Sequence, residues 1–379
     1  MYYTPFSSVV HFEGISHGTD TGSGIKAYQA INQGKFRERW AAELQSHYPN
    51  AVNVFRARDR AWDRKIALVV DHYIPQPDRD AGSRSMVAFI EALLAAGWVV
   101  KFWPDNLWFD PEYGPALQLR GVEIIYGEKR VGGFDRYLAE CGGELDAVLL
   151  SRPHISLPYL RSLRKHAPAV RVAYYGHDLH FRRLAREAEV TGRAELLEEG
   201  ERIGRMERQI WQDADIVLYP SQEEADDVAA LVEGARVAAL PPYAFDAFND
   251  AAQPQGRKGV LFVAGFAHPP NVDAAMWLVD QVMPAIWSRY PDLKLSLVGA
   301  NPTDQVRGLA GPRVEVTGYV SDEELARHYA EARVAVVPLR YGAGVKGKVV
   351  EAMQSGVPLV TTRVGAQGLP GGVHGHRLG

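Results

Sequence analysis

The chain has 379 residues, of which 46% are hydrophobic and 23% are charged, and its net charge is −4. These values are typical of a globular protein of about two domains and give no sign of a basic surface for nucleic acid. The single cysteine, Cys141, excludes intramolecular disulfides and favours a reducing compartment. We find no apolar run of 18 residues and no signal peptide, so the sequence predicts a cytoplasmic protein without a transmembrane segment.

Residues 1–64 differ from the rest of the chain. They contain one possible strand, a turn rich in Gly, Ser and Thr, and one amphipathic helix. A segment of this size is too short to bury a hydrophobic core of its own. We therefore expect it to be separate from the domains that follow, with 1–50 as a tail and 51–64 as a linker.

A repeating strand-and-helix pattern begins at residue 65. The run "KIALVVDHY" (65–73) is typical of a strand buried on both faces, and the helical spacing of 84–98 ends near Gly97, a C-cap residue. Further strands are predicted at 99–104, 147–151, 170–176, 215–221 and 235–243. The pattern indicates a parallel sheet with crossover helices, so 65–243 is predicted to be a Rossmann-like domain.

The pattern restarts after a linker at 244–257. Strands are predicted at 258–266, 293–300, 314–320, 332–338 and 358–362, and helices at 271–291, 321–332 and 348–356. The helix at 321 begins with the capping box Ser321–Glu324. Residues 258–379 are therefore predicted to be a second Rossmann-like domain. The fold class is α/β, with a ligand cleft beyond the carboxyl ends of both sets of strands.

The stretch "YGAGVKGKVVEAMQSGVPLVTT" (341–362) carries the strongest chemical signal. Its glycines allow backbone N–H groups to approach an anion, the following helix points its N-terminus at the same place, and Lys346 and Lys348 add positive charge. Glu351, one turn into the helix, suits the two hydroxyl groups of a ribose. The alternative is that both lysines are solvated and that Glu351 only favours the first helical turn.

Three segments in order, "VLFVAGFAHPPNVDAAMWLV", "LVGA" and "VTGYVSDEELARHYAEARVAVVPLRYGAGVKGKVVEAMQSGVPLVTT", resemble the donor-binding domain of retaining family 4 glycosyltransferases of the GT-B fold. The likeness covers residues 65–370. It implies that 65–243 is the acceptor domain and that a nucleotide-diphosphate sugar, the donor, binds to the second domain, 258–379. The diphosphate would meet Gly265, Phe266 and the two lysines, the base would meet Gly318, Tyr319 and Val320, and Glu351 would hold the ribose. The loop residues implied beside them are Gly344, Val345 and Gly347.

The sequence departs from the family pattern at two places. The family has a second glutamate eight residues before Glu351, where this chain has Ala343, so the donor sugar is open and a deoxysugar such as rhamnose fits. The family also often has an Arg and a Lys after the first strand of this domain. Here that region offers Phe266, His268 and Asn271, and the two loop lysines are expected to replace the lost charge.

In the first domain, Gly82 lies between a strand and a helix and fits the family's glycine loop. The alternative for Gly82 is an ordinary βα turn. His177 and Asp178 follow a strand and match a His-Asp pair that faces the cleft, with the histidine on the transferred sugar; the alternative is a capping or core pair. Glu223 and Glu224 are interpreted as the start of a helix.

The resemblance implies transfer without a protein nucleophile. Lysines and backbone dipoles would stabilise the leaving diphosphate while a hydroxyl of a glycan or lipid-linked saccharide attacks on the same face. Residues 65–379 contain no Asp-x-Asp motif and no histidine cluster with ligand spacing, so we expect no metal and no cofactor. A role in surface polysaccharide synthesis is expected, and it allows peripheral contact with the inner face of the membrane.

The two ends are unusual for this family. The segment "VVHFEGISHGTDTGSGIKAYQAINQGKFRERW" resembles the tail of an inverting family 2 glycosyltransferase of the GT-A fold, in which His11 would help to hold a metal whose other ligands are absent. The second domain stops before the strand and helices that usually complete it, so we expect a truncated C-terminal end. The alternatives are an inactive fragment that at most binds nucleotide, and another GT-B enzyme such as a sugar-nucleotide epimerase.

Overall fold

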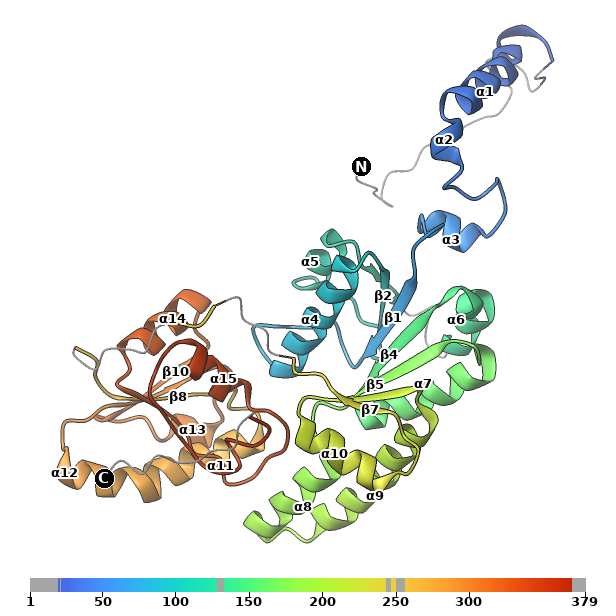
Figure 1. Ribbon diagram of the computed structural model, residues 1–379. Coiled ribbons are helices and arrows are strands. Elements are labelled where there is room, and N and C mark those ends of the chain that lie inside the picture. The colour runs from blue at the N-terminus through green and yellow to red at the C-terminus, as the bar shows by residue number, and fades with distance from the viewer. Residues whose placement is uncertain (1–19, 21, 128–132, 243–246, 250–255, 370–379) are drawn as a thin grey trace. The chain divides into compact units, whose positions relative to one another are not determined.

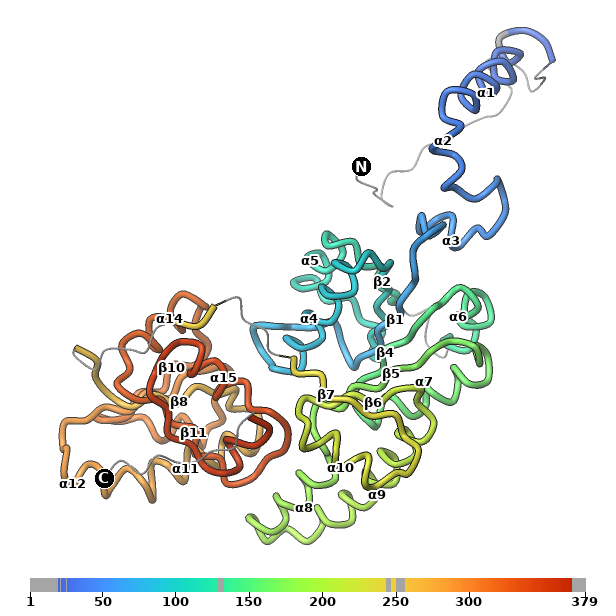
Figure 2. Tube along the Cα trace, in the orientation of Figure 1, coloured from blue at the N-terminus to red at the C-terminus, as the bar shows by residue number. Residues whose placement is uncertain are grey.

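The computed structural model describes residues 20, 22–127, 133–242, 247–249 and 256–369 (Figures 1 and 2). The chain divides into two compact units, Met1–Arg64 and Lys65–Gly379. His11, the possible strand around it and the last ten residues of the chain lie outside the described residues, as does most of the predicted linker at 244–257.

The described part of the first unit is helical. After a 3₁₀ turn, η1 (Gly24–Lys26), it contains α1 (Ala27–Arg39), α2 (Ala41–Leu44) and α3 (Val54–Arg58). None of these three helices buries a residue, and Phe36 and Trp40 are exposed. Arg56 holds the end of the unit together by donating hydrogen bonds to the carbonyl groups of Ala61 and Arg64.

The first sheet of the second unit has seven parallel strands in the order β3-β2-β1-β4-β5-β6-β7 (Figure 1). The strands are β1 (Ile66–Asp71), β2 (Val99–Pro104), β3 (Glu123–Ile124), β4 (Ala147–Ser151), β5 (Arg171–Tyr175), β6 (Ile216–Tyr219) and β7 (Val237–Ala239). Every residue of β1 is buried, as expected for a central strand covered on both faces. The predicted strands of this domain are confirmed, and the two-residue β3 was not predicted.

The helices of the first sheet are α4 (Ala81–Ala95), α5 (Gly114–Leu119), α6 (Phe134–Cys141), α7 (Pro153–His166), α8 (His180–Thr191), α9 (Glu195–Asp213) and α10 (Gln222–Leu231), with the 3₁₀ turn η3 (Gly142–Glu144). Helices α8 and α9 pack against each other through Leu184, Ala188, Leu196 and Ile203. Gly97, with φ +82°, follows the end of α4 as predicted. Glu223 and Glu224 do begin a helix, since the Ser221 hydroxyl caps α10.

The second sheet has five parallel strands in the order β10-β9-β8-β11-β12. They are β8 (Val260–Val263), β9 (Leu295–Val298), β10 (Val314–Gly318), β11 (Val334–Val337) and β12 (Leu359–Thr361). Its helices are α11 (Pro269–Trp277), α12 (Met283–Arg289), α13 (Asp304–Arg307), α14 (Asp322–Glu331) and α15 (Gly347–Gln354). The predicted capping box is present, because Ser321 and Glu324 each bond to the backbone N–H of the other.

The helix predicted over 271–291 is not one regular α-helix. It contains α11, a π-helical turn η4 (Leu278–Val282) and α12. Pro284 lies in the first turn of α12 and has no N–H to donate, so the regular i→i−4 bonding cannot continue through this point. The apolar stripe is kept, and Leu278, Met283 and Trp287 remain buried in the core of the second sheet.

Each sheet has one topological switch point, where the connections that leave two neighbouring strands run toward opposite edges of the sheet. In the first sheet it lies between β1 and β4, and in the second between β8 and β11. Ligands of open parallel sheets bind beyond the carboxyl ends of the strands at such switch points. The loops after these strands are therefore the first places to look for a site.

Candidate functional site

A cavity of about 680 Å³ is lined by loops that follow the strands of both sheets of the second unit. From the first sheet it receives the loops after β1, β4 and β5, and from the second the loops after β8, β9, β10 and β11. Most of the residues predicted from sequence line it: Gly82, His177, Asp178, Gly265, His268, Asn271, Tyr319, Val320, Val345, Lys346, Gly347, Lys348 and Glu351.

Three predicted residues do not line this cavity. The Phe266 side chain is fully buried in the core, its ring packs against Phe262, and its N–H donates to the carbonyl of Ala300. Gly318 ends β10 and lies behind Tyr319. Gly344 is buried in the loop contact between the two sheets. The geometry therefore leaves Phe266 a packing role.

Lys346 is buried beside its own glycine loop. Its ammonium donates to the carbonyl of Ala343 at 2.8 Å and also to that of Gly344. Gly342 and Gly344 have φ angles of +144° and +75°, which an L side chain rarely adopts, so the glycines permit the turn that brings these carbonyls to the lysine. Burial lowers the pKa of Lys346 to about 8, and the carboxylate of Asp178 partly opposes this effect.

Lys348 lies in the first turn of α15. Its Nζ is 2.5 Å from Oδ1 of Asn271, and the Asn271 amide nitrogen donates to the carbonyl of Gly265 at 2.8 Å. Asn271 thus connects the loop after β8 to the lysine of α15. Burial lowers the pKa of Lys348 to about 7, with a further contribution from the positive charge of Lys346.

Two contacts join residues of the second sheet's loops to those of the first. Glu351 forms an ion pair with Arg84 of α4, and the Tyr319 hydroxyl is 3.3 Å from Oδ2 of Asp78. The carboxylate predicted to hold a ribose is therefore paired with an arginine in this structure. A ribose that bound to Glu351 would have to compete with Arg84 or share the carboxylate with it.

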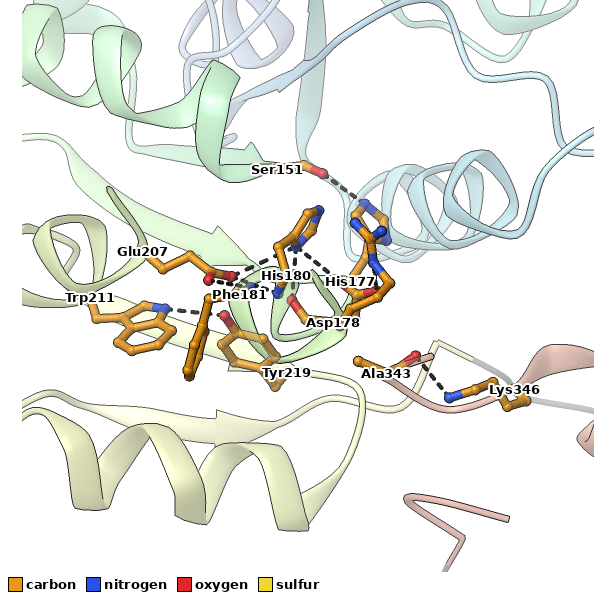
Figure 3. Close-up of polar contacts among 11 residues, drawn as sticks. Ser151, His177, Asp178, His180, Phe181, Glu207, Trp211, Tyr219, Ala343 and Lys346 are labelled. Carbon is orange, nitrogen blue, oxygen red and sulfur yellow. Dashed lines mark hydrogen bonds and ion pairs between the residues drawn. The ribbon is translucent and has the colours of Figure 1, made fainter. Parts of the chain in front are cut away.

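On the first sheet, His177 follows β5 and is held by Ser151 at the end of β4. The Ser151 hydroxyl and Nε2 of His177 are 2.8 Å apart (Figure 3). Burial and the charge of Arg152 lower the pKa of His177 to about 4, so the ring is neutral at pH 7. A Cβ on Gly82 would lie 2.8 Å from a guanidinium nitrogen of Arg152, so the glycine makes room for that arginine at the start of α4.

Asp178 is surrounded by cations. Its Oδ1 is 2.8 Å from Nδ1 of His180 (Figure 3). Its Oδ2 accepts a hydrogen bond of 3.0 Å from Nε of Arg183. Burial would raise the pKa of Asp178, but His180 and Arg183 outweigh it and hold this pKa well below its ordinary value. Burial likewise disfavours a charged His180, but Asp178 outweighs burial and raises the pKa of His180. An ionised Asp178 in contact with two cations results.

Glu207 of α9 caps the helix that begins beside this pair. Its carboxylate accepts hydrogen bonds from the backbone N–H groups of His180 at 3.0 Å and Phe181 at 3.1 Å. Leu179, the residue before α8, has no side chain that can do this. Burial raises the pKa of Glu207 to about 7. The position of the His177–Asp178 loop thus depends on a glutamate about thirty residues further along the chain.

Sequence reasoning missed several residues of the first sheet's loops. Arg152 donates from Nε to the buried Asp71 at 2.8 Å, and its backbone has φ +69°, an unusual angle for a residue other than glycine. Arg183 was also missed. Arg152 directly follows β4, so a cation just after a predicted strand could have indicated it, whereas Arg183 of α8 and Glu207 of α9 had no such signal.

Among the residues that the structure describes, no group of three or more His, Cys, Asp or Glu side chains is arranged to hold a metal ion. The predicted absence of a metal and of a cofactor stays a prediction. In the same described residues, no helix is both long and apolar enough to cross a bilayer.

Comparison with known proteins assigns the second sheet. Residues 257–378 match the family model described as "Glycosyl transferases group 1". These residues form a glycosyltransferase group 1 domain. A phosphatidyl-myo-inositol mannosyltransferase of Mycobacterium tuberculosis is 31% identical over 128 residues, which are 32% of this chain and 33% of that protein. An uncharacterized 44.6 kDa protein in the cps region of Klebsiella pneumoniae is 27% identical over 172 residues, 43% of each chain. The chain thus spans less than half the length of these curated relatives.

A solved trehalose-6-phosphate synthase has the same fold as the second unit. Its TM-score is 0.50 at 14% sequence identity, over 79% of this chain and 85% of that one. The glycosyltransferase group 1 domain and the sheet before it therefore have the architecture of GT-B proteins, and the predicted fold class is confirmed. The assignment to family 4 and the resemblance of the first 50 residues to a GT-A tail stay predictions.

Proposed function

We propose that this protein is a glycosyltransferase that moves a sugar from a nucleotide-diphosphate sugar to a hydroxyl group of a glycan or lipid-linked saccharide, with retention of anomeric configuration and without a metal. One observation carries the proposal. Lys346, Lys348 and Glu351 of the glycosyltransferase group 1 domain line the same cavity as His177 and Asp178 of the preceding sheet. A donor held by Lys346, Lys348 and Glu351 would thus present its sugar to His177 and Asp178.

The charges suit a leaving diphosphate. Lys348 lies in the first turn of α15, whose N-terminal end carries a partial positive charge, and Lys346 precedes that helix directly. A preorganised donor of this kind is worth about 3–4 kcal/mol of transition-state stabilisation. The acceptor oxygen would form its bond to the anomeric carbon as the bond to the diphosphate oxygen breaks, and the leaving diphosphate would take the acceptor's proton.

The neutral ring of His177 suits contact with the transferred sugar. With Nε2 bonded to Ser151, its other ring nitrogen is available for a hydroxyl group of the donor sugar. The loop that carries Ala343 has no carboxylate at that position for sugar hydroxyls, which favours a donor with fewer hydroxyl groups, such as a deoxyhexose. The name of one curated relative, a phosphatidyl-myo-inositol mannosyltransferase, supports a saccharide or lipid-linked acceptor. We propose a role in surface polysaccharide synthesis, with peripheral contact at the inner face of the membrane.

The first test is a thermal-shift panel with UDP, GDP, dTDP and ADP on the 379-residue chain. Binding at a ligand concentration 100 times Kd adds about 2.7 kcal/mol to the free energy of unfolding, which is easily detected. We expect one nucleotide to stabilise the wild type and to lose its effect in Lys348→Ala and Glu351→Ala. Lys258→Ala is the matched control, because Lys258 is exposed at the opposite, amino end of β8.

The panel also identifies the base of the donor. The corresponding nucleotide sugars are then incubated with saccharide acceptors, and the anomeric configuration of the product is determined by NMR. Stabilisation by no nucleotide, or by one that the three variants bind equally well, would refute the donor site. An inverted product would refute retention while leaving the transfer itself established.

A further inference from the structure

Arg183 is a second-turn residue of α8 that faces the donor side of the cavity. It lines the cavity together with His268, Lys346 and Lys348. Removal from water together with the positive charges of Arg183 and Lys348 lowers the pKa of His268 below its ordinary value, so both cations act on the same ring. Arg183, which belongs to the first sheet's half of the second unit, thus reaches the loops that carry the proposed diphosphate site.

The two lysines of that site are already engaged. Lys346 donates two of its three N–H groups to carbonyls of its own loop, and Lys348 donates one to Asn271. Their pKa values of about 8 and about 7 also mean that each loses part of its charge near neutral pH. A guanidinium keeps its charge at every physiological pH and presents a planar fork of donors that fits phosphate oxygens.

Arg183 has donors to spare. Its only hydrogen bond to a described residue runs from Nε to Oδ2 of Asp178, and its two terminal nitrogens have no hydrogen-bond partner in that part of the chain. His180 also contacts the Asp178 carboxylate, so one hydrogen bond from the arginine is enough to hold that carboxylate in place. The Nε contact fixes the guanidinium of a residue that lines the cavity.

We propose that Arg183 binds the donor diphosphate through its terminal nitrogens, opposite Lys346 and Lys348. This inference rests on the proposed function. Arg183 lies outside residues 257–378, which match the glycosyltransferase group 1 family. The leaving diphosphate would therefore be held by residues on both sides of the cavity. Tight binding of the diphosphate then requires residues from the loops of both sheets, whereas binding of the nucleoside requires only those of the second sheet.

The test is calorimetric titration of the 379-residue chain with UDP, GDP, dTDP and ADP, each beside its parent nucleoside. We expect Arg183→Gln to weaken binding of the preferred diphosphate about tenfold or more and to leave binding of the nucleoside unchanged, because only the phosphates lose a charged donor. Arg183→Lys, which keeps the charge without the fork, should fall between wild type and Arg183→Gln. Arg186→Gln is the control, since Arg186 is an exposed residue of the same helix paired with Glu189.

The outcomes separate the two proposals. Diphosphate binding that is lost in Lys348→Ala but kept within twofold in Arg183→Gln would overturn the role of Arg183 and leave the donor site standing. An equal loss for diphosphate and nucleoside in Arg183→Gln would also overturn it, because it would show that Arg183 only supports the fold around Asp178. Absence of any diphosphate binding by the wild type would overturn the proposed function and this inference together.

Discussion

A Cβ atom on Gly344 would lie 2.7 Å from the carbonyl oxygen of His177, closer than real Cβ atoms approach. The glycine loop before α15 therefore rests on the backbone of the loop after β5. This contact brings the lysines of the glycosyltransferase group 1 domain next to the His177–Asp178 pair.

The contact predicts a specific cost for Gly344→Ala. Gly344 has φ +75° and Gly318 has φ +76°, but a Cβ on Gly318 would have no described atom within 4 Å. The left-handed backbone lowers the free energy of unfolding of both alanine variants by about 1–2 kcal/mol. Only Gly344→Ala is destabilised further by the clash. We expect a lower melting temperature and weaker nucleotide binding for Gly344→Ala than for Gly318→Ala. Equal melting temperatures would show that the loops do not touch in solution.

Diphosphate affinity should depend on pH through Lys348. A phosphate needs the protonated amine, whose pKa of about 7 lies well below the ordinary lysine value. Affinity should therefore fall as pH rises from 7.5 to 9, a range in which the diphosphate itself stays fully ionised. Lys348→Arg keeps its charge throughout this range, so its diphosphate affinity should fall less steeply with pH than that of the wild type. The slope that remains in this variant comes from Lys346. Calorimetric titration at four pH values measures both slopes, and parallel slopes would contradict the prediction.

Glu207 should be essential to the position of the His177–Asp178 loop. Glu207→Ala leaves the N–H groups of His180 and Phe181 without their acceptor, and a lost helix cap costs about 1–2 kcal/mol. We expect lower stability together with weaker contact between the loop and any donor sugar. Glu201→Ala on the same helix is the control, because that side chain is mostly exposed. Urea unfolding of the two variants gives the comparison, and equal midpoints would argue against the cap.

Glu224 should make stability depend on pH. It is fully buried, one carboxylate oxygen accepts a hydrogen bond from the Ser221 hydroxyl, and burial raises its pKa to about 7. A carboxyl group whose folded pKa is raised favours folding most below its unfolded pKa, and this contribution is lost as pH rises through 7. The contribution of Glu224 to the free energy of unfolding should therefore fall between pH 4.5 and 7, against the rising contribution of His177 and His268, whose lowered pKa values favour folding as pH rises over this range.

The neutral variant Glu224→Gln isolates this effect. Its free energy of unfolding should fall less, or rise more, with pH than that of the wild type over the same range, while Glu207 contributes the same slope to both. Glu223→Gln, at the exposed neighbouring position, should behave as the wild type does. Denaturant unfolding at pH 5, 6 and 7 measures the slopes. A Glu224→Gln variant with the wild-type slope would show that this carboxylate is not desolvated in solution.

The sequence alone determined most of the α/β fold. Short apolar runs such as 147–151 were long enough to be strands and too short to be helices, and the glycines, prolines and capping residues between them marked the ends of elements, as Ser321 and Gly97 do. The order of strands and helices was enough to predict two parallel sheets. Because ligands of such sheets bind beyond the carboxyl ends of strands, and because the family resemblance pointed to the same loops, most of the residues predicted for the site do line the cavity.

Only the tertiary structure decided which side chains contact one another. Glu351 meets Arg84, Gly344 meets His177, and Glu207 meets the start of α8, and all three pairs are far apart in sequence. Local pattern carries no information on such pairs, since they depend on how elements pack rather than on spacing along one of them. Phe266 is an opposite case, because its neighbours in sequence line the cavity and its own side chain does not. The family resemblance implied that it meets the diphosphate, but its ring lies in the core, where burial of an aromatic side chain is favourable.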